Sequence, residues 1–294
     1  MEPSSQDDIV WKVLNVPISS ELDQSYRYDI NSVPTNTTSA GKTYRGYDRS
    51  DAEVTIEVIP KELLEKDKDQ KVLFDDRMKV LSTVNLDQIV SLKHSIESKN
   101  NYYLISEAHT GLSLEELLKP KTKIDEKEAL LIIKRVAEAF DLVEKMNLNE
   151  FGEEKFVMIH RNIKPKNIVY HEGRPKLRGF EFSKFITKET KLEILAGSLQ
   201  YVPPQTLSFS SYTYKRDIWA LGITIYRAIV GEFPWRGETR KELLQKIESY
   251  PLKVPKSVSK EMTELIGEML KVKEEERIDW EGILKHPALK ALDA

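Results

Sequence analysis

The sequence of 294 residues contains no cysteine. Disulfide bonds, a thiol nucleophile and zinc held by cysteine are therefore excluded. Histidine is also scarce, and its five copies are scattered along the chain, which argues against a metal site. The net charge of -3 gives no sign of binding to nucleic acid or to an anionic membrane surface.

Long hydrophobic runs are absent as well. The longest apolar stretch, Ile218–Phe233, is interrupted by Arg227 and Glu232, so it predicts a buried helix and not a membrane span. The start, Met1–Asp8, is polar and acidic and does not resemble a signal peptide. With 40% hydrophobic and 32% charged residues, we expect a globular protein of the cytoplasm.

The pattern along the chain divides it into a β-rich part and a helical part. Residues 1–25 have weak periodicity and are interpreted as an N-terminal extension. Residues 26–107 contain several predicted strands, of which Val54–Ile59 alternates most clearly, and one helix over Gln70–Thr83. After a hinge at about 107–111, residues 108–294 are mostly helical, as the helix starting at Asp125 illustrates. We expect an α+β protein of two lobes with a cleft between them.

Short motifs then recur in a recognisable order. The most specific is I-H-R-N-I-K-P-K-N at Ile159–Asn167. The others are V-T-I-E at Val54–Glu57, G-F-E at Gly179–Glu181, P-P-Q at Pro203–Gln205, D-I-W-A-L-G at Asp217–Gly222, Arg277, and H-P at His286–Pro287. Over roughly Tyr26 to Leu292 this set resembles the eukaryotic protein kinase family. It is weakly similar to the calmodulin-dependent and Unc-51-like groups. The resemblance implies a bilobal fold with a small β-rich N-lobe, one αC helix and a larger α-helical C-lobe.

Four positions depart from what the resemblance requires for catalysis. Asn162 replaces the catalytic aspartate, and an amide cannot accept a proton at neutral pH. Gly179 replaces the magnesium-binding aspartate. Glu57 replaces the lysine of the third strand, and Arg77 stands at the αC glutamate position. Glu57 and Arg77 either form an inverted ion pair or are separate, with Arg77 as a solvated helix charge.

Other family positions are retained. Gly41 is the last of the three loop glycines, the other two being replaced by Asn36 and Thr38. With Lys164 and Asn167, Gly41 is interpreted as a vestige of cofactor binding. The resemblance also implies a structural skeleton, in which Asp217 caps the catalytic-loop backbone and a neutral glutamine replaces the family's glutamate beside an arginine. Its members are Leu81, His160, Arg161, Phe180, Asp217, Gln205 and Arg277.

These departures predict a pseudokinase, that is, a kinase fold that is not an enzyme. We expect no catalytic residues, no metal and no cofactor beyond weak magnesium-independent ATP. Its function would be that of a scaffold or allosteric regulator bound to a protein partner, such as an active kinase or its regulator. The alternative is an atypical nucleotide-binding enzyme in which Glu181, Lys61 or Lys164 rebuilds the site. Phosphorylation of Thr187, Thr190 or Ser198 is left open, with Arg161 available to bind a phosphate.

Overall fold

The computed structural model describes residues 11–15, 25–38, 41–108, 111–121, 123–146, 156–193 and 197–292. They belong to two units. The first contains the described residues up to Asp75 and those from Val90 to residue 108. The second contains Asp76–Ile89 and the described residues after 110.

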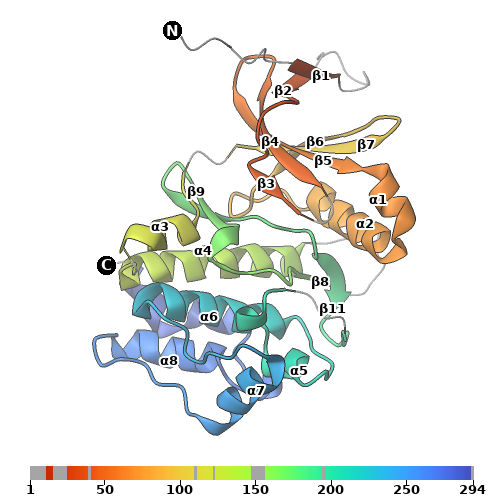
Figure 1. The fold of residues 1–294 in the computed structure, drawn as a ribbon. Coiled ribbons are helices and arrows are strands. Elements are labelled where there is room, and N and C mark those ends of the chain that lie inside the picture. The colour runs from red at the N-terminus through yellow and green to blue at the C-terminus, as the bar shows by residue number, and fades with distance from the viewer. Residues whose placement is uncertain are drawn as a thin grey trace, which may run out of the picture. The chain divides into compact units, whose positions relative to one another are not determined.

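The first unit is built on an antiparallel sheet, in which β3 pairs with β4 and the other strands follow the order β1-β2-β4-β5-β7-β6 (Figure 1). Helix α1, Lys61–Lys66, follows the fifth strand directly. The strands are β1 (Trp11–Asn15), β2 (Ser25–Asp29), β3 (Asn36–Thr37), β4 (Lys42–Asp48), β5 (Glu53–Pro60), β6 (Leu92–Glu97) and β7 (Asn101–Glu107).

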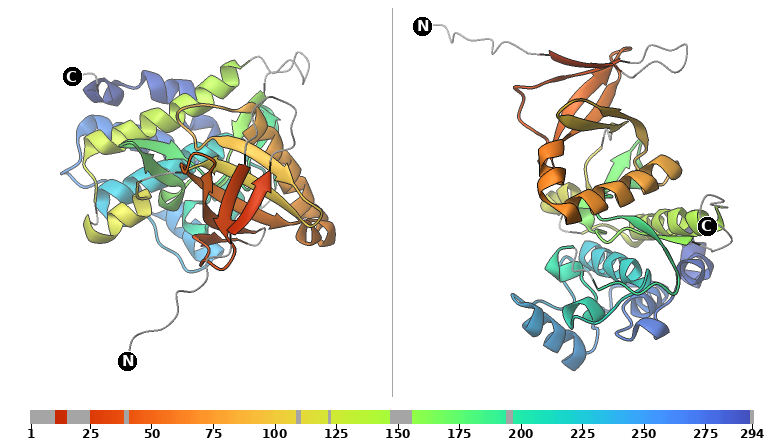
Figure 2. Two further views of the ribbon diagram at one scale, coloured as in Figure 1. Left: turned by 90° about the horizontal axis from the view of Figure 1, so that it is seen from above. Right: turned by 90° about the vertical axis from the view of Figure 1, so that its right-hand side faces the viewer.

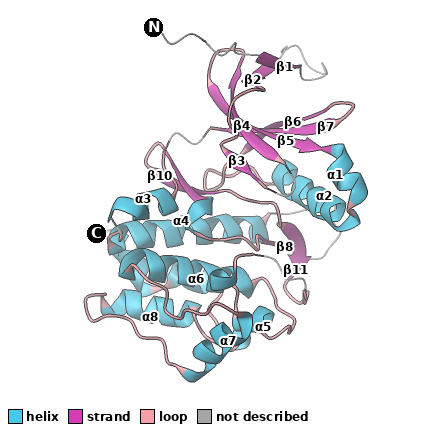
Figure 3. Ribbon diagram, in the orientation of Figure 1, coloured by secondary structure: helices cyan, strands magenta, loops and turns pink. Residues whose placement is uncertain are grey.

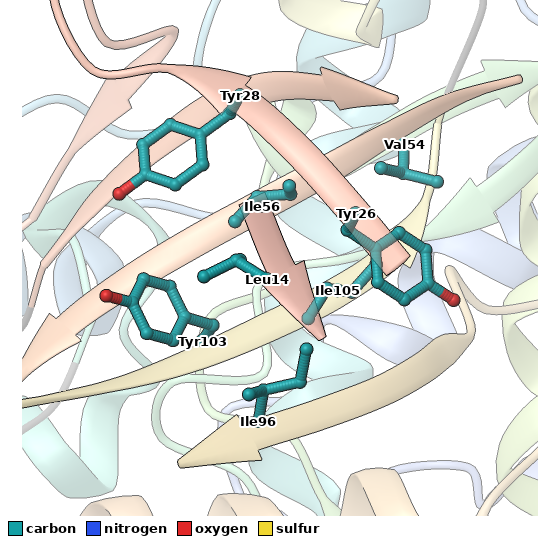
Figure 4. Close-up of a cluster of buried hydrophobic side chains, with 8 residues drawn as sticks. All are labelled: Leu14, Tyr26, Tyr28, Val54, Ile56, Ile96, Tyr103 and Ile105. Carbon is teal, nitrogen blue, oxygen red and sulfur yellow. The ribbon is translucent and has the colours of Figure 1, made fainter. Parts of the chain in front are cut away.

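Strand β1 is a feature that the sequence did not reveal. Trp11–Asn15 lies in the segment interpreted as an extension, yet it pairs in register with β2 at the edge of the sheet (Figure 2). Leu14 packs into the hydrophobic cluster of the sheet, which is drawn in Figure 4. A strand of five residues offers too little alternation to be detected in the sequence. The other members of the cluster are Tyr26, Tyr28, Val54, Ile56, Ile96, Tyr103 and Ile105.

The second unit is mainly helical (Figure 3). Helix α2 (Lys68–Thr83) begins in the first unit and ends in the second. The other helices are α3 (Leu114–Lys121), α4 (Glu126–Lys145), α5 (Pro204–Leu207), α6 (Lys215–Val230), α7 (Arg240–Ser249), α8 (Lys260–Met269) and α9 (Trp280–Lys285). Two strand pairs accompany them, β8 (Phe156–Ile159) with β11 (Lys184–Thr187), and β9 (Ile168–His171) with β10 (Arg174–Leu177).

Helices α4 and α6 form the centre of the second unit. Helix α4 packs against α6, α9 and β8. Nearly every side chain of α6 is buried, which confirms the buried helix predicted for this stretch. The helix ends at Gly231, whose φ of 91° is favourable only for glycine. No helix within the described ranges is long and apolar enough to cross a membrane.

Candidate catalytic site

The loop that follows β8 is held by a carboxylate from helix α6. Asp217 accepts hydrogen bonds from the backbone nitrogens of His160, at 2.6 Å, and Arg161, at 2.8 Å. Arg161 has a left-handed backbone with φ of 63°, a conformation that costs free energy outside glycine. The two hydrogen bonds to Asp217 therefore stabilise a strained turn. Burial raises the pKa of Asp217 to about 6.

His160 is a neutral part of the same loop. Its Nδ1 accepts from the backbone nitrogen of Asn162 at 3.2 Å, and its Nε2 lies 3.1 Å from the carbonyl oxygen of Arg178. Because a carbonyl only accepts, Nε2 must carry the proton. The ring also packs edge-on against Phe180, with 4.7 Å between centroids. Complete burial lowers the pKa of His160 to about 3.

The side chain of Asn162 is used as a hydrogen-bond donor. Its Nδ2 donates to Oε2 of Glu181 at 3.2 Å and to the carbonyl oxygen of Gly179 at 3.4 Å. The backbone oxygen of Asn162 in turn accepts from Nδ2 of Asn167 at 2.8 Å. Asn162 thus links Asn167 of the same loop with Glu181 of the later G-F-E segment. An aspartate in its place would lack the amide protons and would set a second carboxylate beside Glu181.

Gly179 has no room for a side chain. Its φ is 86°, and a Cβ atom at this position would lie 2.5 Å from Cγ and Nδ2 of Asn167. An aspartate here therefore requires Asn167 to move. In active kinases an aspartate at this position and the asparagine of the catalytic loop both bind magnesium. In this chain the side chain of that asparagine, Asn167, fills the space that the aspartate would need.

Magnesium in kinases is held by one aspartate and one asparagine together with nucleotide phosphates. This loop offers a comparable donor set at shifted positions. The Nδ2 of Asn167 is bonded to the loop, which leaves its Oδ1 as a possible ligand, and the carboxylate is that of Glu181. A magnesium ion bound by these two residues would neutralise charge on the β- and γ-phosphates of ATP.

Lys164 lies within the same loop and contacts the activation segment. Its Nζ donates to Oγ of Ser198 at 3.2 Å. Burial lowers the pKa of Lys164. The threonines of this segment bond to each other: the Oγ1 atoms of Thr187 and Thr190 are 2.9 Å apart, and Oγ1 of Thr190 also accepts from the backbone nitrogen of Thr187.

The remaining sequence-predicted site residues of the first unit have local packing roles. Gly41 has no room for a side chain, because a Cβ would lie 2.3 Å from the carbonyl oxygen of Val58. Thr38 accepts from the backbone nitrogen of Gly41 through its Oγ1 at 3.2 Å, so this hydroxyl closes a turn. Lys61 bonds to Glu97 and lies 5.0 Å from the ring centroid of Tyr102.

Glu57 and Arg77 are both buried, each with 9% of its surface exposed. Glu57 lies on β5, opposite Thr43 and Leu104 on the neighbouring strands. Arg77 lies on α2, so its interpretation as a solvated helix charge does not agree with its burial. Charged side chains are buried almost only when they are paired. That these two pair with each other stays a prediction.

The supporting skeleton includes one residue that sequence reasoning missed. Arg277 is buried and donates through Nη2 to Oε1 of Gln205 at 3.2 Å. Its Nη1 also lies 3.7 Å from a carboxylate oxygen of Glu274, which supplies the negative charge that Gln205 lacks. The spacing of three residues was the available signal. Leu81, the last skeleton residue, is buried on α2.

Comparison with known proteins places this geometry in context. Residues 38–289 match the family model of the protein kinase domain. The chain is 26% identical over 213 residues to the serine/threonine-protein kinase atg1 of Dictyostelium discoideum, covering 71% of this chain and 30% of that protein. It is 26% identical over 262 residues to the serine/threonine-protein kinase unc-51 of Caenorhabditis elegans, covering 84% and 29%. It is 27% identical over 295 residues to the calcium/calmodulin-dependent protein kinase cmkA of Emericella nidulans, covering 96% and 66%.

The chain spans less than a third of the length of atg1 and unc-51. The matches to these relatives and to the family model confirm some of the predictions made from the sequence and contradict others. The predicted α+β kinase fold and the similarity to the Unc-51-like and calmodulin-dependent groups are confirmed. The predictions that the chain is not an enzyme and has no cofactor are contradicted, because the relatives are named as kinases and kinases use Mg-ATP. With a match across residues 38–289, this chain belongs to the protein kinase family.

Proposed function

We propose that this kinase domain acts chiefly by binding a protein partner, as a scaffold or allosteric regulator, while its own Mg-ATP binding is impaired and its phosphoryl transfer slow. The partner is an active kinase or a regulator of one. A cytoplasmic location, expected from the sequence, is part of the proposal. The observation that carries it is the role of Asn162, whose amide donates to Glu181 where a proton acceptor would be needed.

The rate argument rests on the missing base. A positioned general base contributes roughly 10²–10⁴ to the rate of a reaction, and an amide cannot supply it. Glu57 adds an electrostatic cost if it approaches nucleotide phosphates as the family's lysine does. Two unit charges about 4 Å apart interact by about 4 kcal/mol at an effective dielectric constant near 20. Replacing attraction by repulsion therefore weakens nucleotide binding.

The test must take account of the contact between Asn162 and Glu181. Asn162→Asp alone would place two carboxylates side by side, so the informative variant is Asn162→Asp with Glu181→Gly. We expect this double variant to transfer phosphate from ATP to a generic protein substrate at least ten times faster than the wild type. The matched control, Asn162→Ala with Glu181→Gly, should show no gain. A wild-type rate equal to that of the double variant would contradict the proposal.

Protein binding needs its own measurement. Purified active kinases of the Unc-51-like and calmodulin-dependent groups are titrated with this chain, and their turnover is followed. We expect the chain to change the turnover of one of them without ATP bound to the chain itself. The variant Glu57→Gln, which removes the charge of this buried side chain and nearly keeps its size, should retain the effect. If no such kinase responds, the regulatory role is refuted for this class of partner.

A second function is favoured by the carboxylate of Glu181. In this alternative the chain is an atypical phosphotransferase in which Asn167 and Glu181 hold magnesium and Lys164 contacts phosphate. Thermal unfolding with ATP tests it directly, since a ligand at about 100 times its dissociation constant adds roughly 2.7 kcal/mol of stability. A shift that requires magnesium and disappears in Glu181→Gln supports the alternative. A shift independent of magnesium, or none, rules it out.

A further inference from the structure

Phe209 has a backbone and a side chain that both cost free energy. It lies just after helix α5 and has a left-handed backbone with φ of 58°. This conformation is rare for a bulky residue, and Phe209 is the only apolar residue that adopts it in the described part of the chain. Its ring is 70% exposed, more than any other large apolar side chain described in the second unit. Strain and exposure do not help the unit to fold, so together they indicate a function.

The turn that contains Phe209 is fixed by the structural skeleton next to it. The carbonyl oxygen of Gln205 accepts from the backbone nitrogen of Ser210 at 2.8 Å and from Oγ of Ser208 at 3.0 Å. The side chain of Gln205 accepts in turn from Nη2 of the buried Arg277 at 3.2 Å. Because hydrogen bonds hold the residues on both sides of Phe209, its backbone stays strained and its ring stays exposed.

A second apolar side chain and a guanidinium lie beside this turn. The Nε2 of Gln205 donates to the carbonyl oxygen of Val272 at 2.6 Å, and 38% of Val272 is exposed. The guanidinium of Arg240 lies 4.8 Å from the ring centroid of Phe209. Arg240 is the first residue of helix α7, which packs against α5 (Figure 1). An exposed aromatic ring together with an arginine is typical of the centre of a protein interface.

Three cations around this apolar pair have no acidic partner among the described residues. Arg240 and Lys241 begin helix α7, and Lys271 lies next to the exposed valine. No ion pair joins any of the three to a carboxylate of the described chain, whereas Glu242 in the same turn of α7 pairs with Lys246. The amino end of a helix disfavours positive charge, so Arg240 and Lys241 do not stabilise α7.

We propose that these residues form a docking surface for an acidic segment of a protein partner. Its members, which we call the Phe209 surface, are Phe209, Val272, Arg240, Lys241 and Lys271. An apolar side chain of the partner packs on Phe209 and Val272, and carboxylates beside it pair with the cations. A basic or purely apolar partner would leave these cations desolvated and unpaired, which costs free energy. The inference rests on the proposed function and adds where its partner binds and what that partner presents.

The first measurement separates binding from folding. Phe209→Gly removes the ring and relieves the strained backbone, so the midpoint of urea unfolding should stay the same or rise. A role of the ring in folding predicts the opposite, a lower midpoint. The double variant Arg240→Gln with Lys241→Gln removes two cations from the amino end of α7 and should likewise not lower the midpoint.

Binding is measured on the whole chain with peptides, without any kinase present. A phage library of random short peptides is selected on the wild-type chain, and the enriched peptides are synthesised with a fluorescent label. We expect peptides in which an aromatic or aliphatic residue is flanked by aspartate or glutamate. Phe209→Gly and the double variant of Arg240 and Lys241 should each weaken binding by about tenfold or more in fluorescence anisotropy. Leu142→Ala, at an exposed leucine of α4, is the matched control and should not weaken it.

Loss of peptide binding in Phe209→Gly without loss of stability supports the proposal. The proposal is overturned if no selected peptide binds, if the peptides are basic or uncharged, or if Phe209→Gly binds them unchanged or unfolds at a lower midpoint. It is also overturned if the wild-type chain associates with itself in sedimentation and Phe209→Gly prevents this, because the surface would then hold a second copy. Acidic peptides that bind here while no active kinase responds to the chain would refute the kinase partner and support the surface.

Discussion

Restoring the family's aspartate at Gly179 should destabilise the second unit. The left-handed backbone of this residue costs a non-glycine residue roughly 1–2 kcal/mol. Its Cβ would also displace Asn167, whose hydrogen bond to the backbone oxygen of Asn162 contributes about 1 kcal/mol. Together these effects predict a loss of about 2–3 kcal/mol for Gly179→Asp. Gly179→Ala should lose a similar amount, because both costs arise at the Cβ atom.

The second unit contains its own control for the backbone contribution. Gly173, in the turn between β9 and β10, has φ of 75°, and nothing lies within 4 Å of a Cβ placed there. Gly173→Ala therefore carries the cost of the left-handed backbone without a steric clash. The excess cost of Gly179→Ala over Gly173→Ala measures the displacement of Asn167. In an Asn167→Ala background that excess should shrink, because the displaced side chain is already absent.

Urea denaturation followed by tryptophan fluorescence is the appropriate assay. Trp219, Trp235 and Trp280 all lie in the second unit and are buried, so their emission reports its unfolding. Thermal unfolding is a second assay. For a unit of about 200 residues, a loss of 2–3 kcal/mol in the free energy of unfolding corresponds to a fall of roughly 4–12 °C in Tm. If Gly179→Ala is no less stable than Gly173→Ala, the packing argument is refuted. The same result would remove the physical reason for glycine at this position.

Three further predictions follow from buried groups. Because its pKa is lowered to about 3 in the fold, His160 contributes stability above pH 6.5 that is lost as pH falls toward 3. Urea titrations would compare the free energy of unfolding of the wild type with that of His160→Phe. The difference should shrink by about 1.4 kcal/mol for each pH unit below 6.5, and a difference that does not change with pH would contradict this prediction. Leu14→Ala should cost about 2–4 kcal/mol and speed hydrogen exchange of β2 amides, because Leu14 is 5% exposed; unchanged exchange would show that β1 does not stabilise the sheet. Finally, a double-mutant cycle on Glu57→Gln and Arg77→Gln should give a coupling energy above about 1 kcal/mol if they pair, and none if each has another partner.

Much of this protein was predictable because its decisive signals are local in sequence. The order of the short motifs was sufficient for the family and the fold class. The chemistry of a single residue type was sufficient to show that Asn162 cannot act as a base. An apolar stretch broken by only two charged residues was sufficient to predict the buried helix α6. None of these inferences requires knowing which distant residues meet.

Tertiary structure decided the questions that depend on distant residues. Asn162 and Glu181 are 19 positions apart, and their hydrogen bond joins two residues that both depart from the family pattern. Asp217 and His160 are 57 positions apart, yet one buried carboxylate fixes the strained loop. The steric need for glycine at position 179 depends on where Asn167 lies, and the place of β1 depends on a free sheet edge. Periodicity and residue type carry no record of such contacts, because the distance between two side chains is fixed only when the whole unit is packed.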